Sequence, residues 1–357
     1  MGIDLTTFGW NNFFSANFSE YAKKGFLPAR ISREHTHIYF LYSESGELTA
    51  EVSGRIRHTS DSKCEYPAVG DWVAVNPRPG EELATIHAVL PRSSSFSRKV
   101  AGINIQEQVI AANIDLVFIV NGLDSNFNPR RIERYLAHIH DSGAEPVIVL
   151  NKTDLCDDVE SRISEVKRIA HQTPVIAICA LDEKGIQPLK KFVEKGKTIA
   201  LLGSSGVGKS QIINTLIGWD KQTVCEVRND SKGRHTTTNR ELILLPCGGL
   251  VIDTPGIREI QVWCDVDGLN KAFADVVECS AHCRFSDCSH EVEPGCAVQK
   301  AIEEGKLDSA RVQSYIKMKK EISELEKLQN RRIKITERTK WKKLKNKTQS
   351  AEKNFHD

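Results

Sequence analysis

One stretch, GSSGVGKS at positions 203–210, constrains the fold of this chain more than any other. It follows the apolar run TIALL and opens the segment KSQIINTLIG, whose apolar residues recur at helical spacing. Its glycines let the backbone curl so that N–H groups converge at the start of a helix. This pattern, set between a strand and a helix, predicts a phosphate-binding loop in a layered α/β domain.

Individual roles follow from the same pattern. We expect Lys209 to reach the β- and γ-phosphates of a nucleotide and Ser210 to bind Mg²⁺. A glycine-rich turn without a ligand is the alternative, and the strand and helix on either side argue against it. The residues expected to contact the nucleotide here are Gly203, Ser204, Ser205, Gly206, Val207, Gly208, Lys209, Ser210 and Gln211.

Three more apolar runs, at 115–120, 147–150 and 175–179, have the length and composition of buried strands. Asn128 and Pro129 offer an N-cap and a first helical residue for the segment PRRIERYLAHIH. Strands that alternate with helices in this way form parallel sheets with helices on their faces. We therefore expect a mostly parallel, helix-covered sheet.

A second motif, Asn151-Lys152-Thr153-Asp154, follows the strand 147–150. Open α/β sheets bind ligands at the carboxyl ends of their strands, which is where this motif falls. Asp154 can accept two hydrogen bonds from guanine, at N1–H and the 2-amino group, and adenine lacks that pair of donors. We expect Asn151 to hold the ring edge and the loop, and the stem of Lys152 to lie along the base. The motif therefore indicates guanine specificity.

The strand 175–179 ends in Cys179-Ala180-Leu181. This triplet resembles the Ser-Ala-Lys loop of GTPases, whose backbone contacts the guanine oxygen. Cysteine stands here in place of serine. Cys179 and Ala180 are therefore included among the residues expected to contact the base.

Two further segments follow the phosphate-binding loop. The apolar run 250–253 ends in Asp253 and leads to Gly256; we expect Asp253 to hold Mg²⁺ through water and the Gly256 N–H to face the γ-phosphate. The segment GRHTTT at 233–238 offers hydroxyl groups, Thr237 among them, for a switch loop that closes over Mg²⁺. Taken alone, that segment is an ordinary polar loop.

Position 257 carries an apolar residue where Ras-like enzymes place a water-orienting glutamine. Because Ile257 cannot position water, we expect slow intrinsic hydrolysis and a site that something else completes.

The order of these motifs differs from that of Ras-like proteins, in which the phosphate-binding loop comes first. Here Lys152 precedes Lys209 along the chain. A nucleotide site of this kind is defined by loops at one edge of a sheet and not by chain order. The sequence therefore predicts a circularly permuted GTPase domain.

Short alternating apolar stretches occur between residues 36 and 76, with a further strand expected at 84–90. Several short strands in so small a region suggest a barrel, and we favour an OB-fold; any other small β-domain is the alternative. The segment PRSSSFSRK at 91–99 is polar, and we expect a linker or loop there.

Composition and charge indicate the cellular compartment and the partners expected for this chain. The chain has 357 residues, 40% hydrophobic and 27% charged, and no apolar run approaches the roughly 18 residues of a membrane span. The N-terminus lacks a secretory signal, so we expect a cytoplasmic, reducing location for its ten cysteines and no membrane partner. The net charge of +2 conceals a basic tail at 331–347, in which nine Lys or Arg face one acid. Such a tail suits nucleic-acid phosphates, and a solvated helix end is the alternative.

These motifs, together with a cysteine–histidine cluster that ends in EPGCAV, resemble the RsgA (YjeQ/YloQ) family of bacterial ribosome-small-subunit-dependent GTPases. The resemblance covers about residues 35 to 330. It implies a multidomain α/β fold with an N-terminal OB-fold, a circularly permuted Ras-like GTPase domain and a C-terminal zinc-binding helical domain. The corresponding ranges are 1–34 for an N-terminal extension, 35–108 for the OB-fold RNA-binding domain, 109–265 for the GTPase domain, 266–330 for the zinc domain and 331–357 for the tail.

The cysteine cluster predicts a metal site. Cys283, Cys288, His290 and Cys296 offer three thiolates and one imidazole, a closed set typical of structural zinc. The family pattern selects the same four residues. Cys279 and His282 lie close enough in sequence that one of them is an alternative ligand.

Two functions follow from the resemblance. The first is a monomeric GTPase that hydrolyses GTP to GDP and phosphate when stimulated by the 30S subunit, acts late in 30S maturation and binds 16S rRNA. The second is a GTP-dependent RNA-binding placeholder in which hydrolysis is incidental. Lys209, Ser210 and Asp253 favour the first, whereas Ile257 leaves the second open.

The family motif also suggests which group completes the site. His235, beside the switch threonines, is our candidate for the group that Ile257 does not supply. The alternative is a histidine that only packs against or caps its own loop.

Overall fold

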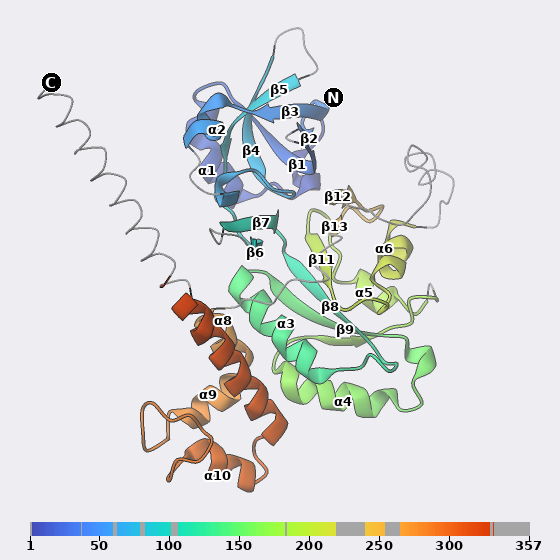
Figure 1. The fold of residues 1–357 in the computed structure, drawn as a ribbon. Helices are drawn as coiled ribbons and strands as arrows, with labels where there is room; N and C mark the ends of the chain where they lie inside the picture. The colour runs from blue at the N-terminus through green and yellow to red at the C-terminus, as the bar shows by residue number, and fades with distance from the viewer. Residues whose placement is uncertain are drawn as a thin grey trace, which may run out of the picture. The chain divides into compact units, whose positions relative to one another are not determined.

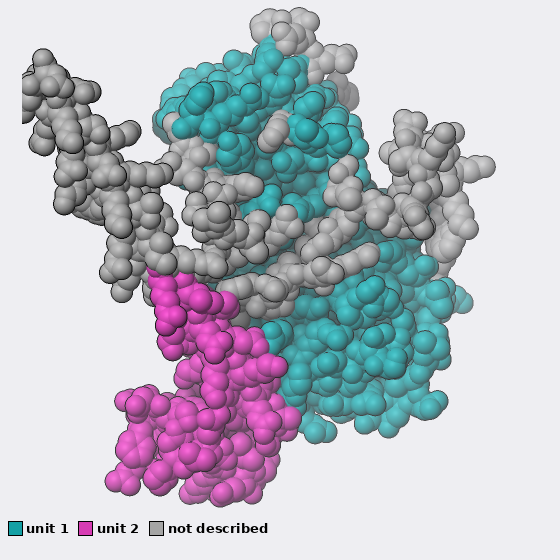
Figure 2. Space-filling view, viewed as in Figure 1, with its two compact units in different colours: residues 1–99, 107–263 teal, residues 100–106, 264–357 magenta. Residues whose placement is uncertain are grey.

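The computed structural model describes residues 2–36, 38–59, 63–78, 83–100, 106–182, 184–218, 240–253, 265–328 and 331. The chain divides into two compact units, residues 1–99 with 107–263 and residues 100–106 with 264–357 (Figure 2). Each unit is described by itself below. Within the described part of the chain, every helix is too short or too polar to span a bilayer.

Five strands close into a barrel at the start of the first unit (Figure 1). Their order is β1-β2-β3-β5-β4, and β4 returns to pair with β1, so the barrel has no open edge. The strands β3 and β5 run parallel and the other barrel pairs are antiparallel. The elements are β1 (Leu27–His35), β2 (Ile38–Ser43), β3 (Gly46–Val52), β4 (Trp72–Pro77), β5 (Leu83–Val89), the helix α2 (Gly54–Thr59) and the 3-10 turn η2 (Lys63–Glu65). This closed five-stranded barrel confirms the OB-like prediction.

The barrel begins earlier than the expected boundary at residue 35. Strand β1 starts at Leu27, and the sequence pattern missed it because Arg30, only 1% exposed, occupies a buried position in the middle of the strand. Two elements precede β1: η1 (Leu5–Phe8) and α1 (Asn12–Ala22). The ring of Phe14, from α1, lies 5.8 Å from that of Trp72 on β4. The N-terminal segment therefore packs onto the barrel.

The segment predicted as a loop at 91–99 is partly a strand. Its residues from 95 onward form β6 (Ser95–Val100), which pairs with β7 (Gln106–Ala112). The Ser94 hydroxyl accepts from the Ile114 N–H at 2.8 Å and donates to the Ile114 carbonyl at 2.6 Å. The polar residues that suggested a loop thus have partners from a distant segment.

The nucleotide-binding domain is built on a sheet of order β10-β9-β8-β11-β13-β12. Its pairs are parallel except β12 with β13, which confirms the mostly parallel sheet. The strands are β8 (Leu116–Gly122), β9 (Glu145–Asn151), β10 (Val175–Ala177), β11 (Thr198–Leu202), β12 (Glu241–Leu244) and β13 (Leu250–Asp253). The helical elements are α3 (Pro129–Ser142), η3 (Thr153–Leu155), α4 (Val159–Ala170), α5 (Gln187–Lys190) and α6 (Lys209–Ile217).

Local sequence explains how two of these elements begin. Helix α3 starts at Pro129 because Asn128 caps it, its side-chain oxygen accepting from the Arg131 N–H at 3.1 Å. Strand β11 is buried along its whole length, with β8 and β13 on either side. The strand that leads into the phosphate-binding loop is therefore held at the centre of the sheet, against a core that includes Phe118, Val149, Ile199, Ile212 and Val251.

The barrel and the nucleotide-binding sheet form one continuous sheet. Arg33 of β1 lies opposite Glu241 of β12 in an antiparallel pairing. The Tyr42 hydroxyl, on β2, donates to the Leu242 carbonyl at 3.2 Å. A barrel strand is thus a direct neighbour of β12, the strand that follows the expected switch segment 233–238 along the chain.

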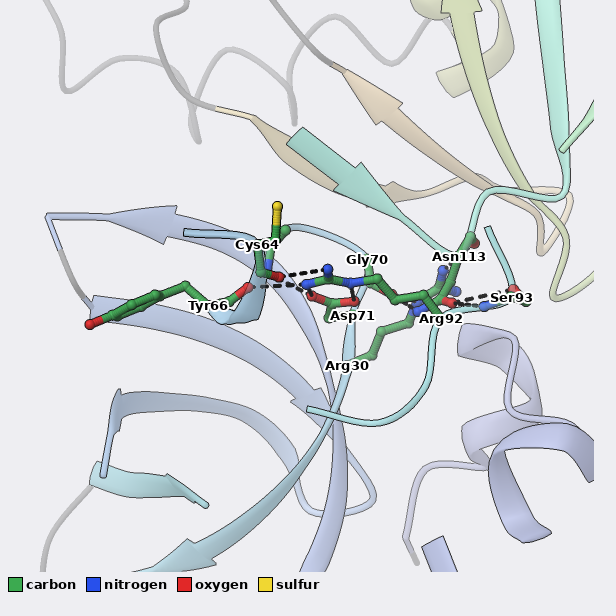
Figure 3. A network of polar contacts seen from close by, with 9 residues as sticks. Arg30, Cys64, Tyr66, Gly70, Asp71, Arg92, Ser93 and Asn113 are labelled. Atoms are coloured by element: carbon green, nitrogen blue, oxygen red, sulfur yellow. Dashed lines mark hydrogen bonds and ion pairs between the residues drawn. The ribbon is translucent and has the colours of Figure 1, made fainter. Parts of the chain in front are cut away.

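A buried guanidinium also joins the barrel to the nucleotide-binding domain (Figure 3). The side chain of Arg30 donates to three carbonyls: to Phe8 at 2.5 Å, to Gly70 at 3.1 Å and to Asn113, just before β8, at 2.9 Å. Burial lowers the pKa of Arg30 to about 10, which still leaves it charged at neutral pH. With the donors of Arg30 bound to carbonyls from three segments, these segments are held together at one point.

A buried ion pair lies next to this guanidinium (Figure 3). Arg92 donates to both oxygens of Asp71, at 2.7 and 2.8 Å, and to the carbonyls of Cys64 and Tyr66. Burial raises the pKa of Asp71, whereas the hydrogen bonds from Arg92 oppose that shift. Bidentate pairing of this kind supports a buried carboxylate where an exposed pair would contribute little.

The second unit is helical. Its elements are α8 (Val266–Ala272), α9 (Ala274–Ser280), α10 (Ala297–Glu303) and a long helix at residues 309–328. Arg311 donates to both carboxylate oxygens of Asp275 at 2.8 Å, and the ring of Tyr315 lies 5.6 Å from that of Phe273. Along the long helix, the side chain of Val312 is buried whereas that of Leu328 is exposed.

Candidate nucleotide site and candidate metal centre

The phosphate-binding loop connects β11 to α6 as the sequence predicts. A β-carbon added to Gly203 would lie 2.3 Å from the carbonyl oxygen of Val120, so only glycine fits between the loop and strand β8. Lys209 begins α6, and its ammonium donates to the carbonyls of Gly203 and Ser204 at 2.7 and 2.6 Å. The lysine side chain thus folds back over the phosphate-binding loop.

Asn151 connects the base motif to the phosphate-binding loop. Its side-chain nitrogen donates to the Val207 carbonyl at 2.8 Å, and its side-chain oxygen accepts from the Ala180 N–H at 3.0 Å. A β-carbon at Gly208 would lie 2.2 Å from the Asn151 amide nitrogen, so the glycine makes room for this contact. One buried side chain therefore holds the two base loops and the phosphate loop in register.

The acid expected to select guanine is exposed and has a thiol beside it. The Cys179 Sγ donates to a carboxylate oxygen of Asp154 at 3.2 Å. Thr153 is held to the neighbouring strand end by its N–H, which donates to the Ile178 carbonyl at 3.3 Å. The residues that the sequence assigned to the base thus lie together at the carboxyl ends of β9 and β10.

The expected catalytic residues are only partly described. Asp253 ends β13, on the parallel neighbour of the strand that leads to the phosphate-binding loop. Ser210 lies in the first turn of α6. The predicted positions of His235, Thr237 and Gly256 fall outside the described residues.

Two charged residues that the sequence analysis did not single out contact the motifs. Asp124 pairs with the Lys152 ammonium at 2.6 Å, and Arg131 donates to the Ser204 hydroxyl at 3.0 Å. Both come shortly after β8. Their position beyond the carboxyl end of a buried parallel strand could have indicated them, because α/β sheets place functional groups there.

The candidate metal centre brings the four predicted ligands together in the second unit. The ligand atoms of Cys283, Cys288, His290 and Cys296 all lie within 4.8 Å of one another. Cys279 and His282 are not members of this cluster. The alternatives that the sequence left open are therefore not favoured by the geometry.

The separations suit a tetrahedral zinc ion. Ordinary zinc–ligand bond lengths place two sulfurs about 3.8 Å apart and a sulfur and a nitrogen about 3.5 Å apart. Here the Cys283 and Cys296 sulfurs are 3.9 Å apart, and each lies 3.6 Å from the Nδ1 of His290. His290 adopts a left-handed backbone with φ of 63°, which is uncommon for histidine and turns it toward the sulfurs. The donor set therefore fits zinc.

The local electrostatics differ among these ligands. Burial raises the pKa of the Cys288 thiol to about 11. Burial also opposes ionisation of Cys283, but backbone hydrogen bonds from Val298 and Ala297 lower its pKa overall. Burial lowers the pKa of His290, with a smaller effect from Lys319, and so favours the neutral imidazole that binds metals.

Comparison with known proteins decides the family. A family model described as RsgA GTPase matches residues 89–263, and one described as 50S ribosome-binding GTPase matches residues 198–335. The small ribosomal subunit biogenesis GTPase RsgA of Opitutus terrae is 46% identical over 353 residues, 96% of each chain. This chain belongs to the RsgA GTPase family. The protein of that name from Syntrophotalea carbinolica is 42% identical over 330 residues, 90% of each chain.

Solved structures support the architecture. The crystal structure of YjeQ from Thermotoga maritima is 27% identical, with a TM-score of 0.63 over 83% of this chain and 98% of that one. YloQ, described as a circularly permuted GTPase, is 23% identical, with a TM-score of 0.61 over 84% of this chain and 96% of that one. As a member of the RsgA GTPase family, the chain is a GTP hydrolase whose GTPase domain is circularly permuted.

Proposed function

We propose that this GTPase acts on the small ribosomal subunit late in its maturation, contacts 16S rRNA and hydrolyses GTP to GDP and phosphate when the 30S subunit stimulates it. The names of its relatives support this partner. The structural observation that supports the proposal is the continuous sheet, in which barrel strand β1 pairs with β12, the strand that follows the proposed switch segment 233–238 along the chain. A barrel that binds rRNA in this arrangement would bear directly on the strands of the nucleotide site.

The proposed roles follow from the geometry around Asn151. Asp154 accepts from guanine, and the side chains and backbone around it hold the base. Lys209 leaves the carbonyls that it now contacts and reaches the β- and γ-phosphates, because a phosphate oxygen offers the ammonium a full negative charge. Ser210 and Asp253 would hold Mg²⁺, which when bound offsets the negative charge of the phosphates.

The catalytic group remains a separate proposal. His235 and Thr237 are proposed to complete the switch loop, and the Gly256 N–H to face the γ-phosphate. Ile257 offers no hydrogen bond to water, so the order that orients the attacking water must come from elsewhere in the complex. We therefore expect hydrolysis to be slow in the free protein.

The Cys₃His cluster is proposed to hold one structural zinc ion. Its four protein ligands leave no open position for a reacting water, and closed sets of this kind stabilise small helical domains. We further propose that the protein works as a monomer in the cytoplasm, where its nucleotide and its ribosomal partner are found.

The test is GTP turnover by the full chain, measured as phosphate release, alone and with purified 30S or 50S subunits. We expect 30S subunits to raise turnover strongly and 50S subunits to leave it near the intrinsic rate. Turnover that is the same in all three reactions, with GTP-dependent 30S binding retained, would favour the placeholder function that Ile257 suggests. Loss of GTP-dependent 30S binding as well would contradict both functions.

A further inference from the structure

The connection from β8 to α3, residues 123–128, carries none of the GTPase motifs and yet is tied to one of them. The Leu123 N–H donates to the carbonyl of Asn151, in the base motif, at 2.8 Å. The Asn121 side-chain nitrogen donates to the Asn128 carbonyl at 3.2 Å. Asn128 in turn caps α3. With both of its ends hydrogen-bonded, the connection has little freedom to move.

At its start, the connection holds the lysine of the base motif. The Lys152 ammonium lies 2.6 Å from an oxygen of Asp124, and the two side chains are 25% and 19% exposed. The other oxygen of Asp124 accepts from the Asn126 N–H at 3.0 Å, so the local turn orients the carboxylate. Lys152 has a left-handed backbone with φ of 68°, an uncommon conformation for a residue with a side chain. The ion pair thus fixes the side chain of a residue whose backbone conformation is unusual.

Beyond the connection, the first turn of α3 holds the phosphate-binding loop. The Arg131 guanidinium donates to the Ser204 hydroxyl at 3.0 Å, while Lys209 donates to the Ser204 carbonyl at 2.6 Å. Ser204 is thus held from two sides, by its side chain and by its backbone. Arg131 itself is placed by its N–H bond to the cap residue Asn128.

We propose that the β8–α3 connection and the first turn of α3 together form a positioning element of the GTP site, in which Asp124 sets the place of Lys152 beside the base and Arg131 sets the place of Ser204 in the phosphate-binding loop. The base and the phosphates are opposite ends of one ligand. Holding both contacts from one short segment keeps their spacing constant, and small misplacements of binding groups are costly. This inference rests on the proposed roles of Lys152 and the loop.

The ordinary alternative is a pair of surface contacts with no effect on binding, because exposed ion pairs contribute little. The Arg57–Glu51 pair on the barrel is such a contact, with side chains 50% and 38% exposed. Arg57→Ala is therefore the matched control for Arg131→Ala. Asp157→Ala, at an exposed acid three residues beyond Asp154, is the control for Asp124→Ala.

The experiment measures equilibrium binding of fluorescent GDP and GTP analogues to the full chain. We expect Asp124→Ala and Arg131→Ala each to raise Kd about fivefold, the size of one partly buried charged contact. The two controls should leave Kd unchanged, and all four variants should melt at the same temperature without nucleotide. Asp124→Asn and Arg131→Lys, which keep the shape or the charge, should restore part of the affinity if the alanine variants fold poorly.

A double variant tests whether Arg131 acts through Ser204. If it does, Arg131→Ala/Ser204→Ala should bind nucleotide no more weakly than the weaker single variant, whereas independent residues would give additive losses. Additive losses, or unchanged Kd in Asp124→Ala and Arg131→Ala, would overturn the inference. Lys209→Ala separates this from the proposed function: if it also binds GTP normally, the assignment of the phosphate-binding loop itself fails.

Discussion

The proposed selection of guanine depends on a single carboxylate at the surface of the candidate site. Asp154 is exposed, and the Cys179 thiol donates to one of its oxygens, so the acid faces the solvent with its orientation already restricted. A carboxylate in this place matches two donors on guanine. The thiol that makes this contact belongs to Cys179, which we predicted to stand at the serine position of the Ser-Ala-Lys loop.

Substitution of that carboxylate tests its proposed role. Asp154→Asn should weaken GTP binding about 10- to 100-fold, because an amide presents a donor to the guanine 2-amino group and one or two charge-assisted bonds are lost. Xanthosine triphosphate, which has an oxygen at that place, should bind better than it does to the unchanged protein. Competition binding measures both, with Asp157→Asn as the control. Unchanged GTP affinity would show that the motif does not bind guanine.

Sequence patterns predict the motif residues of the candidate site but not the residues that hold them in position. Asn151, Asp154 and Lys209 occur in short motifs whose chemistry is specific, so each was predicted from its neighbours in sequence. Asp124 and Arg131 contact residues that are 28 and 73 positions away, and no local pattern indicates such a contact. Only the pairing of β8 with β9 and β11 brings them to the site.

Elements with one consistent signal were predicted well. Strand β11 spans Thr198–Leu202 as expected, because it is apolar throughout and is followed at once by the glycine-rich loop. Elements with conflicting signals were missed. The strand β1 contains the buried Arg30, whose charge is compensated by carbonyls from three distant segments. Such compensation is tertiary, so the alternating pattern that marks a strand is absent from the sequence.

We expect the loop and helices around the candidate metal centre to depend on a bound zinc ion for their fold. Purified protein should contain about one zinc ion per chain, and Cys288→Ser/Cys296→Ser should lose it and unfold the second unit locally. The reason is that each of the two thiols is buried, and their removal leaves too few ligands to compensate for ordering the loop. Zinc content by mass spectrometry and far-UV circular dichroism give the two readouts.

The matched control is Cys247→Ser/Cys279→Ser, which removes two thiols outside the cluster. It should retain its zinc and its helical signal. Full zinc occupancy in Cys288→Ser/Cys296→Ser would instead point to Cys279 and His282 as ligands.

At the scale of the whole first unit, a continuous sheet and a buried guanidinium join the barrel to the GTPase domain. The barrel reaches β12 through β1, while Arg30 binds the barrel and the segment that leads into β8. Covalently linked domains often move independently unless their interface is extensive. Here the pairing of β1 with β12 and the hydrogen bonds of Arg30 join the barrel to the GTPase domain, so we expect the two to move together.

Removal of the Tyr42 hydroxyl tests whether a partner bound to the barrel affects the nucleotide site through this junction. Burial raises the pKa of Tyr42 to about 12, so the group remains a donor to the Leu242 carbonyl at any physiological pH. Tyr42→Phe removes only that bond, because the ring keeps its stacking on Phe8 at 4.6 Å. Loss of one such bond has a modest effect on stability, about 1 kcal/mol.

If a ribosomal partner on the barrel orders the switch segments through β12, Tyr42→Phe should leave intrinsic GTP turnover unchanged and lower the stimulation by 30S subunits. Tyr21→Phe on α1, whose ring packs against Phe18 and Phe26, is the control and should preserve the stimulation. Phosphate release with and without 30S subunits, at saturating subunit concentration, separates weaker signalling from weaker binding. Equal stimulation of Tyr42→Phe and the unchanged protein would contradict this prediction. It would mean that the effect of the 30S subunit on GTP turnover does not depend on the hydrogen bond from Tyr42 to the Leu242 carbonyl.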